Sequence, residues 1–132
     1  LLHDVGKLVL AMQAPQMLAD DRREAVAQRT SLHAVEQRRR GATHAEIGGY
    51  LMGLWNLAPV VVEAVAFHHA PARAPAGQRP VLAAVHVANV LDSVQRGDAC
   101  AIAELDAEYL AAQGLPPSLD DWRMLLELTA GS

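Results

Sequence analysis

Residues 43–69 read THAEIGGYLMGLWNLAPVVVEAVAFHH, which predicts two consecutive helices with histidine at the start of the first and at the end of the second. Thr43 and Glu46 form a capping box, in which the hydroxyl accepts from a backbone N–H and the carboxylate reaches back to the cap. Residues 56–58 form a turn, and Pro59 suits the first position of the next helix because its fixed φ is already helical. The stretch therefore predicts a helical hairpin that carries imidazole groups.

Proline, glycine and cap residues divide the rest of the chain into further helices, and no segment shows the alternation of a strand. The segment APARAPAGQRP at 70–80 predicts a loop that ends where Pro80 begins the next helix. The first helix of the hairpin carries large apolar side chains at helical spacing, namely Ile47, Tyr50, Leu51 and Leu54. The helices that we expect span residues 1–13, 15–29, 31–40, 43–55, 59–69, 80–96, 105–113 and 119–129.

The composition agrees with packed helices. Hydrophobic residues make up 52% of the 132 residues, but aromatic residues make up only 4%. Alanine, valine and leucine dominate the apolar set, whereas a β-sandwich would need more threonine, isoleucine and aromatic side chains. A chain of this length can bury roughly two thirds of its surface. We therefore predict an all-α bundle of about seven to eight helices.

Charge, cysteine content and hydropathy exclude several classes of function. The formal net charge of −4 gives no general attraction to a phosphate backbone, so we expect no nucleic-acid partner. The lone Cys100 excludes an internal disulfide and a cysteine-based zinc site, and it favours a reducing, cytoplasmic location. No apolar run reaches the roughly 18 residues that span a bilayer, so we expect no membrane partner. The chain starts at Leu1 without methionine, and we expect part of the domain to precede it.

Five of the six histidines lie on or beside apolar helix faces: His3, His44, His68, His69 and His86. For each residue alone, a hydrogen-bonded core or cap histidine is the simpler interpretation, because a buried imidazole without partners costs about 1–3 kcal/mol. Taken together, these residues favour a metal-binding interpretation. The His3–Asp4 and His68–His69 pairs, with His44 at a helix start, form a donor set suited to Fe, Mn, Zn or Ni.

Other polar and aromatic features have structural interpretations. We expect His33, in a polar helix, to be solvated. The run Arg38–Arg40 ends a helix and complements its dipole, with a small patch for an anion or a partner as the alternative. Trp55 and Trp122 are expected to be packing anchors.

The motifs HDVGK at 3–7, THAEIG…HH at 43–69 and VAN at 87–89 occur in an order and spacing that resemble the HDOD domain, a branch of the HD-domain phosphohydrolase superfamily. The resemblance implies an HD-domain-like helical core over residues 1–96. Residues 97–132 resemble the helical extension of HDOD proteins that are fused to an N-terminal receiver domain. We expect this extension to pack on the core.

The resemblance also implies roles for individual residues. In catalytic relatives such as the HD-GYP phosphodiesterases, the lysine at the position of Lys7 approaches the scissile phosphate. The last metal ligand of those enzymes is the aspartate of a VAD motif, and Asn89 stands in its place here. The residues at positions that correspond to metal ligands are His3, Asp4, His44, His68, His69 and Asn89.

Three departures from the catalytic pattern point to a degenerate site. The amide of Asn89 is a weaker ligand for a divalent cation than a carboxylate, and Asp92 lies too far along the helix to replace it. The segment after His69 lacks the HHE and GYP motifs of a cyclic-di-GMP phosphodiesterase. The Gly48–Tyr50 triplet lies within a predicted helix and is no substitute. The chain also shows no histidine upstream of the His3–Asp4 pair.

The resemblance implies a bacterial regulatory module that acts through protein–protein interaction and does not catalyse a reaction. Its partners would be other signalling proteins or a fused N-terminal receiver or sensor domain. No cofactor is expected, although the donor set could hold a divalent transition metal. The alternative is a metal-dependent phosphohydrolase acting on a nucleotide or cyclic dinucleotide. A third interpretation is a module that binds a nucleotide without cleaving it.

Overall fold

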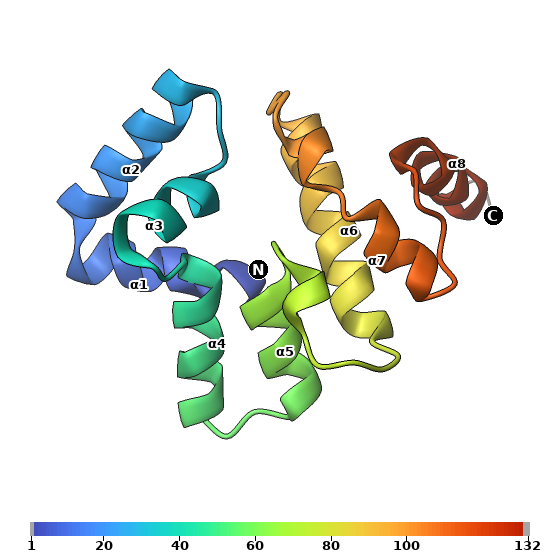
Figure 1. Cartoon of the computed structure of the whole chain (residues 1–132), viewed down its shortest axis with the longest axis horizontal. Helices are drawn as coiled ribbons and strands as arrows, with labels where there is room; N and C mark the ends of the chain where they lie inside the picture. The colour runs from blue at the N-terminus through green and yellow to red at the C-terminus, as the bar shows by residue number, and fades with distance from the viewer. Residues whose placement is uncertain (1, 131–132) are drawn as a thin grey trace.

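The computed structural model describes residues 2–130 and contains no strand within them, so the all-α prediction is confirmed (Figure 1). Three 3₁₀ turns accompany the eight α-helices: η1 (Leu2–Asp4), η2 (Pro71–Arg73) and η3 (Ala101–Glu104). The helices are α1 (Val5–Gln13), α2 (Pro15–Gln28), α3 (Leu32–Arg40), α4 (His44–Leu54), α5 (Pro59–Phe67), α6 (Pro80–Gln95), α7 (Ala107–Ala112) and α8 (Leu119–Ala130). Within this part of the chain, no helix has the length and apolar character needed to cross a membrane.

The helical hairpin of α4 and α5 lies between two groups of helices (Figure 1). Helix α1 packs against α4 and leads into the α2–α3 pair, while α6 packs against α5 and is followed by η3, α7 and α8. The predicted capping box is present: Glu46 N–H donates to Thr43 Oγ1 at 3.3 Å, and Thr43 N–H donates to Glu46 Oε2 at 2.8 Å. The first helix, expected from residue 1, begins at Val5 after the 3₁₀ turn; Leu1 lies outside the described residues.

Helix α4 buries two glycines together with Met52, whereas two of the large apolar side chains of its sequence pattern face solvent. Tyr50 and Leu54 are exposed, whereas Gly48 and Gly49 are buried. A Cβ at Gly49 would lie 2.6 Å from the Cβ of Ala66 on α5. At the other contact of α4, a Cβ at Gly6 of α1 would lie 1.8 Å from the carbonyl oxygen of His44. Glycine therefore allows α1 and α5 to approach the α4 backbone closely.

An ion-pair network around one buried carboxylate joins α2 to α3. Asp21 is fully buried, and its carboxylate pairs with Arg39 at 2.8 Å and with Arg40 at 2.5 Å. Arg38 pairs with Glu24. The arginine run at the end of α3 thus binds acidic groups of the preceding helix, in addition to lying at the negative end of its own helix dipole.

The residues after α6 pack back onto that helix. A buried apolar cluster joins Ala83, Val87, Val90 and Leu91 of α6 to Leu110 of α7 and Leu119 of α8. Trp122 packs against this cluster and donates from Nε1 to the carbonyl oxygen of Pro116 at 2.8 Å, in agreement with its expected role as a packing anchor. The same expectation for Trp55 is wrong, because its side chain is 61% exposed at the end of α4. The boundary at residues 96/97 between core and extension stays a prediction.

We expect Gly49→Ala to lower the free energy of unfolding by roughly 1–3 kcal/mol, because the new methyl group would overlap Ala66 in a tightly packed contact. Gly53→Ala, one turn further along α4, is the matched control. Nothing lies within 4 Å of its Cβ position, so this change should raise stability by roughly 0.5–1 kcal/mol. Urea unfolding at 25 °C measures both. Equal effects of the two substitutions would contradict the proposed packing.

Candidate metal centre

Four of the predicted ligands meet where η1, α4 and the end of α5 come together. Donor atoms of Asp4, His44, His68 and His69 all lie within 4.8 Å of one another. Asp4 Oδ1 lies 3.4 Å from His44 Nε2 and 3.7 Å from His68 Nε2. The Nε2 atoms of His44 and His69 are 3.0 Å apart. Residues separated by up to 65 positions in the sequence thus present imidazole and carboxylate donors to one small volume.

His44 is oriented by a buried carboxylate from α3. Glu36 is fully buried, and its Oε2 accepts from His44 Nδ1–H at 2.7 Å and from the His44 backbone N–H at 2.9 Å. A proton held on Nδ1 leaves the lone pair on Nε2, the atom that faces Asp4. This carboxylate–histidine arrangement is the usual support of a metal-binding imidazole.

His68 is held in the same tautomer by a backbone group. Its Nδ1–H donates to the carbonyl oxygen of Val65 at 2.8 Å, and its side chain is fully buried. Its Nε2 atom is buried without a hydrogen-bond partner, and so is Asp4 Oδ1, which lies 3.7 Å away. Leaving such groups unpaired costs about 1–3 kcal/mol each. A divalent transition metal bound by imidazole and carboxylate would satisfy both, so the residues present fit such an ion.

Burial and neighbouring groups shift the pKa values of the cluster in different directions. Burial acts to raise the pKa of Asp4, but the neighbouring His44, His68 and Lys7 side chains outweigh it and hold that pKa well below its usual value. Burial acts to lower the pKa of His44, but the carboxylates of Asp4 and Glu36 outweigh it, so that pKa is raised. Burial, followed by the neighbouring imidazoles, lowers the pKa of His69, which keeps this ring neutral at pH 7.

His3 and Asn89, the other two predicted ligands, are placed beside the four-residue cluster. The His3 ring lies edge-on to His68 with centroids 4.9 Å apart, and its Nε2 is 3.6 Å from Asp4 Oδ2. Asn89 is buried on α6 and lines, with His3, Asp4 and Asp92, a hollow of about 420 Å³. Asp4 therefore has one side toward the histidine cluster and one side toward this hollow.

Lys7 lies one turn after Asp4 and is bound to it. Its Nζ donates to Asp4 Oδ2 at 2.8 Å. The ammonium group therefore balances the carboxylate at the centre, and the role toward a phosphate that the resemblance implies stays a prediction. His86, by contrast, has both ring nitrogens in use: Nδ1–H donates to the His68 carbonyl at 2.7 Å, and Nε2 accepts from Asp106 N–H at 3.0 Å. It is a hydrogen-bonded core histidine, as the simpler interpretation holds.

The sequence analysis missed three residues around this centre: Glu36, His33 and Glu104. His33 is not solvated as expected, since its side chain is 21% exposed and its ring stacks on His69 with centroids 4.2 Å apart. Burial lowers the pKa of His33 to about 4 and raises the pKa of Glu104 to about 7. Glu104 comes from η3, and its Oε2 lies 3.8 Å from Nδ1 of His33 on α3. The sequence offers no signal for a contact between segments 71 positions apart.

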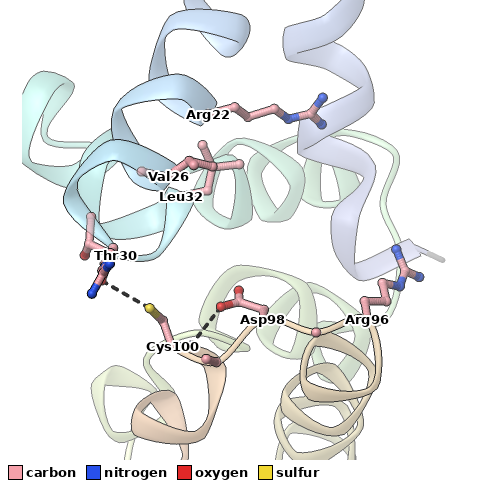
Figure 2. A pocket seen from close by; sticks show the side chains of 11 residues that line it. Arg22, Val26, Thr30, Leu32, Arg96, Asp98 and Cys100 are labelled. Carbon is pink, nitrogen blue, oxygen red and sulfur yellow. Dashed lines mark hydrogen bonds between the residues drawn. The ribbon is translucent and has the colours of Figure 1, made fainter.

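A second hollow of about 790 Å³ lies away from these residues, between the end of α2 and the segment after α6 (Figure 2). Figure 2 shows Arg22 on the α2 side of it, and Arg96 and Cys100 on the opposite side. Cys100 Sγ donates to the Arg29 carbonyl oxygen at 3.1 Å, and Cys100 N–H donates to Asp98 Oδ1 at 2.9 Å. None of the predicted site residues lines this hollow.

The protein is a helical bundle in which a His–Asp pair and a His–His pair lie at one centre. The HDOD domain model matches residues 1–71, more than half of the chain, so the chain belongs to the HDOD domain family. An uncharacterized protein of Treponema pallidum (strain Nichols) is 31% identical over 90 residues, which cover 68% of this chain and 18% of that relative. The chain thus spans less than a fifth of the relative's length. No solved structure matches.

We expect Glu36→Ala to lower the free energy of unfolding by roughly 2–4 kcal/mol, because it leaves two buried N–H groups of His44 without an acceptor. Glu36→Gln keeps an acceptor oxygen and should cost clearly less. Gln37→Ala, at the exposed neighbouring position, is the control and should change stability by less than about 0.5 kcal/mol. Urea unfolding gives the energies, and the ¹⁵N shifts of His44 report whether Nδ1 keeps its proton. Equal losses in Glu36→Ala and Glu36→Gln would contradict this role.

Proposed function

We propose that this chain is a regulatory output module that holds one divalent transition metal between Asp4, His44, His68 and His69 and acts by binding other signalling proteins. The observation that carries the proposal is the meeting of four donors within 4.8 Å, two of them buried without hydrogen-bond partners. The matched family, the HDOD domain, supports the regulatory part of the proposal.

The chemistry of the donors decides which ion the centre would take. Three imidazoles and one carboxylate suit Zn, Fe, Mn or Ni better than Mg or Ca, which prefer oxygen ligands. When bound, such an ion lowers the pKa of coordinated water and polarises phosphoryl oxygens. The ligands come from η1, α4 and the residues after α5, so binding would link three segments of the bundle.

Two features favour a binding module over an enzyme. Asn89 offers a neutral amide where catalytic relatives place a carboxylate, which leaves the centre with one negative charge fewer. Lys7, the group expected to approach a phosphate, is ion-paired with Asp4 at 2.8 Å.

Exposed apolar side chains support a protein partner. On α8, Met124, Leu125 and Leu126 are 58%, 43% and 51% exposed. On α1, Leu8 and Met12 are 59% and 70% exposed. Apolar surface of this kind, when several such side chains lie on one helix, favours contacts with another protein or another domain. A fused receiver or sensor domain would cover the same exposed apolar side chains.

The second candidate function is a metal-dependent phosphohydrolase that acts on a nucleotide or cyclic dinucleotide. One observation favours it: the hollow of about 420 Å³ that opens beside Asp4 and also has His3, Asn89 and Arg96 in its lining. A phosphate placed there would lie near a cationic guanidinium and next to the metal-binding carboxylate.

The proteins are expressed with added Zn or Mn and purified by gel filtration. We expect the variants Asp4→Asn and His68→Gln each to contain one metal ion per chain less than the wild type. The reason is that each removes a donor whose atom has no other partner. Asp92→Asn, the same change of charge at an exposed position on the 420 Å³ hollow, is the control and should retain as much metal as the wild type. Elemental analysis gives the content, and circular dichroism checks the fold. Unchanged metal content in both site variants would refute the proposed centre.

We expect the metal-loaded wild type to hydrolyse neither bis(p-nitrophenyl) phosphate nor a cyclic dinucleotide above the rate of the metal-free chain. Asn89→Asp should tighten metal binding by roughly tenfold or more, because it adds a charged ligand beside Asp4. Isothermal titration and a chromogenic assay measure the two quantities. Hydrolysis by the wild type that disappears in Asp4→Asn would establish the phosphohydrolase instead.

A further inference from the structure

A second group of donors lies on the far side of His69. The Nε2 atom of His69 faces His44, while its Nδ1 faces Glu104 at 3.4 Å. His33 Nδ1 lies 3.8 Å from the same Glu104 oxygen, and the three donor atoms lie within 4.8 Å of one another. These groups come from α3, from the end of α5 and from η3.

Both imidazoles of this group present a buried nitrogen that lacks a hydrogen-bond partner. The Nδ1 atoms of His33 and His69 are both shielded from solvent and make no hydrogen bond. The Glu104 side chain is only 16% exposed. The Ser31 side chain acts on it as a hydrogen-bond partner, and its ion-pair neighbours among the described residues are these two imidazoles. A buried carboxylate without a cation beside it is unfavourable, and so are two unpaired imidazole nitrogens.

The distances from Glu104 Oε2 to the two imidazole nitrogens are longer than a direct hydrogen bond. A direct hydrogen bond between imidazole and carboxylate is much shorter, as His44 and Glu36 show at 2.7 Å. Donors held about 2.0–2.1 Å from a tetrahedral ion lie about 3.3 Å from one another. The values of 3.4 Å and 3.8 Å to Glu104 Oε2 are close to that spacing.

We propose that His33, His69 and Glu104 form a second divalent transition-metal site, joined to the first centre by the His69 ring. Because a neutral imidazole has one lone pair, His69 would bridge two ions as an imidazolate, and its ring proton would be released to solvent. Two imidazoles and one carboxylate suit Zn, Fe, Mn or Co. The rings of His33 and His69 stack with an interplanar angle of 18°, and stacked rings cannot both aim an in-plane lone pair at one ion between them, so the proposal includes a rotation of His33 out of the stack on metal binding.

The second site would attach the C-terminal residues to the part of the chain that the family model matches. His33 and His69 lie within the matched residues 1–71, whereas Glu104 lies outside them. The hydrogen bond from Cys100 to the Arg29 carbonyl oxygen already joins the start of η3 to the end of α2. A metal ion bound by Glu104 would join these parts of the chain by coordinate bonds, which are stronger than that hydrogen bond.

The test counts metal ions in the full chain. Protein stripped with a chelator is loaded with Zn²⁺ or Co²⁺, passed through gel filtration and measured by elemental analysis, and the Co²⁺ absorption bands report the ligand set. We expect two ions in the wild type and one in Glu104→Gln and in His33→Gln. Glu108→Gln, the same change at an exposed position on α7, is the control and should keep two. Circular dichroism and thermal unfolding confirm that each variant is folded.

The outcomes separate this site from the first centre. One ion in the wild type that persists in Glu104→Gln but is lost in Asp4→Asn would overturn the second site and leave the proposed function standing. One ion that persists in Asp4→Asn but is lost in both Glu104→Gln and His33→Gln would support the second site and overturn the first. A wild type without metal would overturn both.

Discussion

The close approach of α1 to α4 is the constraint on which the rest of the structure depends. At Gly6 a Cβ atom would lie 1.8 Å from the His44 carbonyl oxygen, and at Gly48 it would lie 3.1 Å from a methyl group of Val5. Only residues without a side chain allow the two backbones to pack at this distance. Because Asp4 directly precedes α1 and His44 begins α4, the same contact places the carboxylate 3.4 Å from the imidazole.

The hydrogen bonds around the histidines then decide which nitrogen faces the centre. The Glu36 carboxylate holds the proton of His44 on Nδ1, and a backbone carbonyl of α5 does the same for His68. Glu36 also lies 4.0 Å from Arg40, which pairs with the buried Asp21 of α2. The orientation of one potential ligand thus depends on the packing of α2 against α3, and in the proposed module this links the centre to the surface of the bundle.

The fold could be predicted from the sequence because its signals are local. Proline at first helical positions, the Thr43 capping box and glycine at helix ends give the order of the helices and most of their limits, and the motifs indicate the family. The burial pattern of α4 could not be predicted in this way. Tyr50 and Leu54 are exposed whereas Gly48 and Gly49 are buried, because the face of α4 that meets α1 and α5 is the one where the backbones pack closely.

The sequence by itself determined the helices, the family and the residue types that could bind a metal ion, since each depends on neighbours within a few positions. Only the tertiary structure decided which of these residues meet. It brought Asp4, His44, His68 and His69 together, left His3 and Asn89 at the adjacent hollow, and added Glu36, His33 and Glu104. The physical reason is that a donor set depends on distances of 3–4 Å between segments far apart in the chain, and such distances are fixed by how the helices pack.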